Sequence, residues 1–257
     1  MFANTDDNGF WQKEMYSTLA HEFQHMIHFY QKTILLLDEE GANTDTWINE
    51  MISETTEDLV ATKINHAGSR GVSPTDGSAG SAGNTNGRYP LFNENNTLSL
   101  TSWRGQTSDY SKVNAFGAFL TRNYGGAKVL HDIVHNKYID EQAVVDAVHK
   151  APNGANKTFD DLLKEWAIAV LLSDNENLVN LPMYNTGDFT PDTYHNTTYQ
   201  LGSVNFFNYS PQPLLHTTAG TIEAQGNYYY KVGDNLTGTV NISLNLNGQT
   251  EATLIAK

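Results

Sequence analysis

The chain has 257 residues, a formal net charge of −14 at pH 7 and no cysteine. The length suits one larger domain with a small one beside it, and the lack of cysteine excludes disulfides and thiolate metal sites. Because nucleic acids and anionic membranes would repel so acidic a chain, we expect neither as a partner. No apolar run approaches the ~18–20 residues of a transmembrane helix, and because polar residues lead straight into the first motif we expect no signal peptide.

A long amphipathic helix is predicted over residues 10–37. Its apolar side chains recur at spacings of one, three and four, as on one face of a helix, and no proline interrupts them. Residues 6–9 supply turn and capping groups before it, and Gly41 can end it. The apolar positions are Phe10, Trp11, Met15, Leu19, Phe23, Met26, Ile27 and Tyr30.

The motif His21-Glu22-Phe23-Gln24-His25 lies within this helix. Residues four apart share one helix face, so both imidazoles can point at a single ion. Zinc accepts neutral imidazole nitrogen, and a catalytic zinc site keeps one position open for water. Glu22 can then take a proton from that water as general base. The motif therefore predicts a zinc-dependent hydrolase with His21 and His25 as ligands.

A catalytic zinc ion needs a third protein ligand. A second helix is predicted over residues 45–66, and two antiparallel helices with a short connection would bring Glu50 beside the imidazoles. Glu54 and Glu57 lie on the same face and remain alternatives, and Glu54 is also placed to accept the free ring N–H of a liganded histidine. His28 lies about 4.5 Å further along the first helix, so we expect it to pack rather than to bind the ion.

The segment 67–89 is rich in Gly, Ser, Asn, Thr and Pro, which predicts a loop. Further helices are predicted after it, and Tyr110 begins the first of them with a phenol that can donate to a developing oxyanion. His131 and His135 repeat the spacing of four, but we interpret them as an exposed pair rather than a second metal site. The predicted helices cover residues 110–124, 126–137, 140–150 and 158–173.

From about residue 194 the pattern favours strands. Runs at 228–232, 240–244 and 252–255 alternate or are rich in β-branched and aromatic residues, and Asn247-Gly248 is typical of a type I′ hairpin. We therefore predict two parts: a helical region, 1–185, and a β-rich accessory region, 186–257. The fold class is α+β, mainly helical, with a small β-sandwich-like region at the C-terminal end.

The zinc motifs carry a resemblance to a known family. HEFQH followed by NEMISE resembles the gluzincin peptidases of the thermolysin type, which carry HExxH and then NExxSD. The resemblance implies that Glu50 is the third ligand and that Glu54 orients a histidine, although this chain has Glu where the pattern has Asp. It also implies that Tyr110, in a segment similar to the tyrosine-x-lysine segment of aminopeptidase-type gluzincins, stabilises the tetrahedral intermediate.

TLAHEFQHMI, WINE and NYGG together most resemble the hyicolysin family of bacterial neutral metallopeptidases, over about residues 10–175. The family pattern has a sheet upstream of the metal helix, and because few residues precede His21 in this sequence we expect that sheet to be missing. The resemblance implies a zinc-dependent endopeptidase that acts on proteins or peptides, outside the cell or in the cell envelope, and we expect a monomer. The alternative is a zinc-binding fragment or cell-surface module without activity of its own.

Overall fold

The computed structural model describes residues 9–36, 43–69, 87–185, 190–209, 214–218, 220–246, 248 and 250–256. The predicted capping residues 6–8, the predicted helix end at 39–41, most of the loop 67–89 and Asn247 lie outside these residues. No helix in the described part of the chain is both long and apolar enough to cross a membrane.

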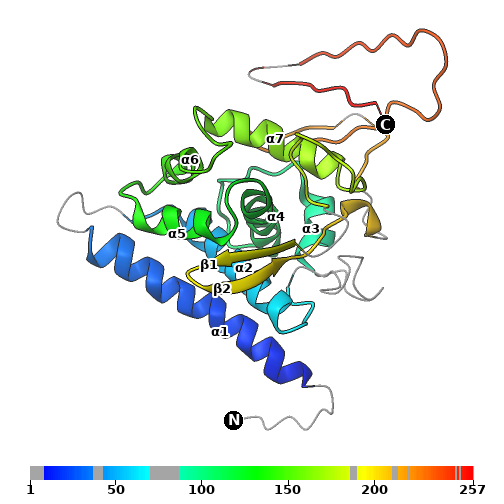
Figure 1. Ribbon diagram of the computed structural model, residues 1–257. Coiled ribbons are helices and arrows are strands. Elements are labelled where there is room, and N and C mark those ends of the chain that lie inside the picture. The colour runs from blue at the N-terminus through cyan, green and yellow to red at the C-terminus, as the bar shows by residue number, and fades with distance from the viewer. Residues whose placement is uncertain are drawn as a thin grey trace.

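The structure is mainly helical, as the sequence predicts (Figure 1). The helices are α1 (Phe10–His28), α2 (Thr46–Lys63), α3 (Arg88–Asn95), α4 (Thr107–Asn123), α5 (Ala127–His135), α6 (Glu141–His149) and α7 (Phe159–Leu171). A π-helical segment, η1 (Phe29–Ile34), continues α1, and a short 3₁₀-helix, η2 (Phe206–Asn208), follows the strands. The helix α3 was not predicted; its Pro90 lies in the first turn, where proline is tolerated.

The helix α4 is the centre of the fold, with α2, α3, α5 and α7 around it (Figure 1). Its side chains are buried along most of its length. Phe116 and Phe119 of α4 form the core together with Trp47 of α2 and Trp166 of α7. At Gly117 the backbone of α4 comes so close to α2 that an added Cβ would collide with the hydroxyl of Thr55. This close approach fixes α2 against α4, and α1 in turn packs on α2.

Lys32 anchors the end of the α1–η1 helix. Its side chain is 2% exposed, and its ammonium donates to the backbone oxygen and Oδ1 of Asn136 at 2.6 and 2.9 Å and to the backbone oxygen of Tyr138 at 2.7 Å. Burial lowers the pKa of Lys32 to about 8. All three donors of the ammonium are therefore used, and they hold the helix against the turn between α5 and α6.

The predicted C-terminal β-sandwich is not confirmed. The sheet in the described residues has two antiparallel strands, β1 (Thr190–Tyr194) and β2 (Thr197–Leu201), joined by His195 and Asn196, both with positive φ as in a type I′ turn.

The segments predicted as strands at 228–232, 240–244 and 252–255 form no ladder, apart from one isolated bridge between Tyr230 and His216. Leu244 and Leu254 are 59% and 73% exposed, so in the described residues no partner strand covers the apolar side chains of 240–244 and 252–255, whereas Tyr229 of the first run packs into the core. In Figure 1 residues 236–246 extend away from the helices.

Candidate metal centre

The face of α1 that packs against the protein is polar. Ser17, His21, Gln24, His28 and Lys32 follow one another at intervals of three and four residues, and all of them are buried. The predicted apolar face lies outward instead: Leu19, Phe23 and Met26, for example, are 54%, 60% and 65% exposed. The prediction of the helix is confirmed, but its buried side is the one that carries the histidines.

Buried apolar residues position the opposing helix. In α2, Trp47, Ile48, Met51 and Ile52 are at most 1% exposed and fill the core, so Glu50, between them in sequence, is directed towards α1. The two helices run antiparallel, because His25 contacts Asn49 near the start of α2 whereas Glu14 contacts His66 just beyond its end.

The three predicted ligands converge on one point. Nε2 of His21 lies 3.1 Å from Nε2 of His25, and each of these nitrogens lies 3.5 Å from Oε2 of Glu50. In a tetrahedral zinc site with bonds of ~2.0–2.1 Å, ligand atoms are about 3.3 Å apart. Oε2 of Glu50 is buried and makes no hydrogen bond in the described structure. The residues present therefore fit a zinc ion.

The charges at this point are strongly coupled. Burial alone would lower the pKa of His21, but Glu50 and Glu57 raise it to about 10. Contact with Glu50 raises the pKa of His25 as well. Burial would raise the pKa of Glu50, yet the two histidines lower it to about 2. The site thus favours positive charge where its three facing atoms meet, which is what a cation-binding site requires.

The other ring nitrogens of the two histidines face different groups. Nδ1 of His25 lies 3.0 Å from Oδ1 of Asn49 and 3.1 Å from the hydroxyl of Ser53, both on α2. Nδ1 of His21 lies 3.2 Å from Oε2 of Glu57. Acceptors on this side of a liganded histidine fix its tautomer and its orientation. The sequence pattern pointed to Glu54 for such a role and did not identify Asn49 or Ser53.

Glu54 lies near His21 but is engaged elsewhere. Its carboxylate, which is fully buried, accepts from Nη2 and Nε of Arg88 at 2.8 and 2.9 Å and from Nδ2 of Asn114 at 3.1 Å. A nitrogen of His21 and oxygens of Glu54 and Glu57 lie within 4.8 Å of one another. The bidentate pair with Arg88 joins α2 to the start of α3 and is the strong form of such a contact.

Tyr110 lies beside this pair, at the start of α4. Asp109 caps the helix there, because its Oδ2 accepts from the backbone nitrogens of Arg104 and Gln106 at 2.7 and 3.1 Å. The guanidinium carbon of Arg88 lies 5.2 Å from the centre of the Tyr110 ring. Burial and the charges of Glu50 and Glu54 raise the pKa of Tyr110, so its hydroxyl stays protonated and able to donate.

The remaining candidates are not among the converging ligand atoms. The side chain of Glu22 is exposed on α1, on the turn that carries His21. His28 is 3% exposed, burial lowers its pKa to about 4, and it belongs to neither of the possible metal-binding groups found in the described residues. The rings of His131 and His135 stack at 3.9 Å, and they too lie outside both groups.

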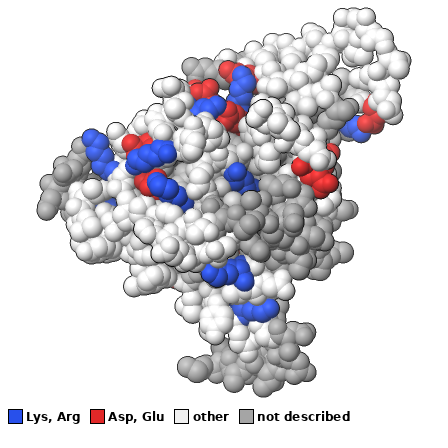
Figure 2. All heavy atoms as spheres, in the orientation of Figure 1, with Lys and Arg blue, Asp and Glu red and all other residues white. Residues whose placement is uncertain are grey.

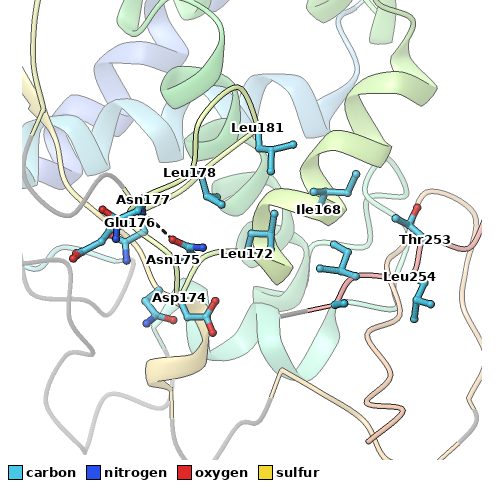
Figure 3. A pocket seen from close by; sticks show the side chains of 14 residues that line it. Ile168, Leu172, Asp174, Asn175, Glu176, Asn177, Leu178, Leu181, Thr253 and Leu254 are labelled. Atoms are coloured by element: carbon cyan, nitrogen blue, oxygen red, sulfur yellow. Dashed lines mark hydrogen bonds between the residues drawn. The ribbon is translucent and has the colours of Figure 1, made fainter. Parts of the chain in front are cut away.

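A hollow of about 1020 Å³ lies between the end of α7, the loop that follows it and residues 253–256 (Figure 3). Leu172 and Leu254 line it, with Asp174 and Glu176 among its polar groups, and it contains none of the predicted site residues. On the face that Figure 2 shows, the described acidic side chains are scattered, and most of them lie beside lysines or arginines. We therefore place the candidate site at the contact of α1 and α2.

Two histidines on one helix turn and a glutamate on an antiparallel helix are the arrangement of a metallopeptidase. The chain belongs to the peptidase M30 family, whose profile matches residues 7–229. It is also 28% identical, over 154 residues, to a protein named neutral metalloprotease ShpI from Staphylococcus hyicus. The match covers 57% of this chain and 30% of that relative, so the chain spans less than a third of the relative's length.

Proposed function

We propose that the protein is a zinc-dependent endopeptidase in which His21, His25 and Glu50 hold the ion. The observation that carries the proposal is the convergence of two imidazole nitrogens and a carboxylate oxygen at 3.1 and 3.5 Å, with the oxygen buried and without a hydrogen bond. Zinc bound there would supply Lewis acidity and lower the pKa of a water molecule in the site.

The reaction needs a base, and we assign that role to Glu22. Its carboxylate takes a proton from the attacking water, whose oxygen forms a bond to the carbonyl carbon of the scissile peptide. As the carbon–nitrogen bond breaks, Glu22 returns the proton to the leaving amine. Tyr110, whose ring lies against Arg88 and whose pKa is raised in part by the charge of Glu50, donates its hydroxyl proton in a hydrogen bond to the oxyanion that forms in between.

The substrate is a protein or peptide, and we propose cleavage within the chain, in the extracellular space or the cell envelope, by a monomer that does not bind nucleic acid. We also propose that the helical region 1–185 carries the reaction and that 186–257 is accessory to it. Phe206 and Tyr229 from the second region pack into the same core as α4, so the two regions share their hydrophobic contacts.

The proposal is tested by digestion of casein by the purified chain. We expect hydrolysis that a zinc chelator abolishes and added zinc restores, because the water would lose its activating cation. Metal analysis of the same samples should give about one zinc per chain. Zinc binding without hydrolysis would favour the alternative, a zinc-binding module without activity, and the absence of bound zinc would contradict the proposed site.

A Tyr110→Phe variant distinguishes catalysis from packing. If the hydroxyl meets only the tetrahedral intermediate, kcat and kcat/KM should fall together, with KM and zinc content almost unchanged. We expect a loss on the order of 10–10³-fold, at or below that of a typical oxyanion donor. The measurement is steady-state hydrolysis of a peptide, with the melting temperature recorded for each variant.

Tyr124→Phe is the matched control, because the Tyr124 hydroxyl donates to Glu165 on α7 rather than to groups of the candidate site. It should lower the melting temperature with little effect on kcat. If the two variants behave alike, Tyr110 has no catalytic role.

A further inference from the structure

We propose that Glu57, and not Glu54, is the positioning residue for His21, and that it does so by accepting the Nδ1–H of the imidazole while Nε2 binds the ion. The inference rests on the proposed function, because it takes His21 to be a zinc ligand. It differs from what the NEMISE motif implies, since the motif gives the orienting role to Glu54.

A zinc-bound His21 requires one particular tautomer of its ring. Nε2 faces Glu50 and His25, so its lone pair would point at the ion, and a neutral ring then carries its proton on Nδ1. Nδ1 is buried and has no hydrogen-bond partner in the described structure, although Oε2 of Glu57 lies 3.2 Å away. A buried N–H without an acceptor is costly, so a small rotation that forms this bond is favoured.

The oxygens of Glu54, in contrast, already have donors. Oε1 accepts from Arg88, and Oε2 accepts from both Arg88 and Asn114. Turning this carboxylate towards His21 would break a bidentate pair in which the carboxylate is fully buried, and it would leave the guanidinium of Arg88 without its partner. The carboxylate of Glu54 is therefore used in the contact between α2 and α3 and does not orient His21.

The geometry of the helix pair also favours Glu57. Glu50 and Glu57 are seven residues apart, so they lie on nearly the same side of α2, about 10 Å from each other along its axis. Because the helices are antiparallel, His21 lies one turn nearer than His25 to the C-terminal end of α2. Nδ1 of His21 therefore faces the carboxylate of Glu57. Nδ1 of His25 instead faces the neutral side chains of Asn49 and Ser53.

The two histidines would then differ as ligands. A carboxylate acceptor raises the basicity of the histidine that it holds, more than an amide or hydroxyl does. His21 would be the stronger donor to the ion, with its ring fixed between Glu50 and Glu57. Loss of such an acceptor typically weakens metal affinity by about 10–100-fold.

The test is the zinc dissociation constant of the full chain, measured by competition with a chromophoric chelator. Glu57→Ala should bind zinc about 10–100-fold more weakly than the parent. Glu57→Gln should recover most of the loss, because the amide oxygen can still accept from Nδ1. Glu54→Gln is the matched variant one turn away: it should lower the melting temperature, because it weakens the buried pair with Arg88, and it should weaken zinc binding less than Glu57→Ala does.

Each outcome separates this inference from the proposed function. If His21→Ala still binds zinc as the parent does, the metal site itself is wrong. If His21→Ala loses zinc but Glu57→Ala keeps the parental affinity, or if Glu54→Gln weakens binding more than Glu57→Ala does, the assignment of Glu57 is overturned.

A second readout applies if Glu57→Ala does not fold. In the zinc-loaded protein, the Nδ1–H proton of His21 should give a downfield nuclear magnetic resonance signal because it is bonded to a carboxylate. In Glu57→Gln this signal should move upfield. A signal unchanged by the substitution overturns the proposal.

Discussion

Replacing Glu22 with glutamine is expected to leave one zinc ion bound per chain and to lower kcat by about 10²–10⁴-fold, the usual contribution of a general base. The amide has nearly the shape of the carboxylate but cannot take a proton from water at neutral pH. Since Glu22 is exposed on α1 and is not one of the three converging residues, the substitution should not disturb the ion. Peptide hydrolysis and metal analysis on one preparation measure both effects.

The control for this experiment is Glu14→Gln, two turns earlier on α1. Glu14 contacts Nε2 of His66 at 2.6 Å, away from the candidate site, and an ion pair of this partly exposed kind is worth roughly 0–1 kcal/mol. Its kcat should therefore stay close to that of the parent. If the parent chain is active and Glu22→Gln has nearly the same kcat, the proposed mechanism is wrong.

Replacing His25 with alanine should abolish stoichiometric zinc binding. The side chain supplies one of three converging atoms, and a catalytic zinc site with two protein ligands does not hold the ion. Glu50→Ala should weaken binding by well over tenfold, because it removes the only carboxylate oxygen that faces both histidines within 3.5 Å in the described structure. Equilibrium dialysis followed by elemental analysis gives the stoichiometry.

His135→Ala is the control for metal binding, since this exposed histidine repeats the spacing of four but faces no carboxylate cluster. It should bind as much zinc as the parent. Undiminished zinc in His25→Ala, or zinc lost in His135→Ala, would contradict the placement of the site between α1 and α2.

Short-range patterns predicted the two helices of the candidate site and the side chains that they bring together. HEFQH placed His21 and His25 on one helix face, and the structure brings Glu50 from the next helix to both, as the spacing suggested. The ends of the later helices also agree within a few residues, because their apolar stripes do face the core.

What the sequence could not predict depends on long-range packing. The apolar stripe of α1 indicated a buried side, but the side that packs is the polar one with His21 and Lys32. Glu54 and Glu57 share a face of α2, and only the position of Arg88, at the start of a helix that was not predicted, shows which of them is already engaged. The strand patterns after residue 227 were present, but pairing requires a partner that local sequence does not reveal.

The polar inner face of α1 has a consequence for how this helix is held. Most helices stay docked because apolar side chains such as leucine and valine on their inner side are removed from water, and this hydrophobic effect is not directional. Here the buried side chains on the described inner side carry a hydroxyl, an amide, imidazoles and an ammonium, and Ile27 is partly buried beside them, so docking depends on directional contacts such as those of Lys32. A cation bound by His21, His25 and Glu50 would link α1 to α2. The ion would then stabilise the contact between the two helices, which apolar side chains usually do, in addition to its role in the reaction.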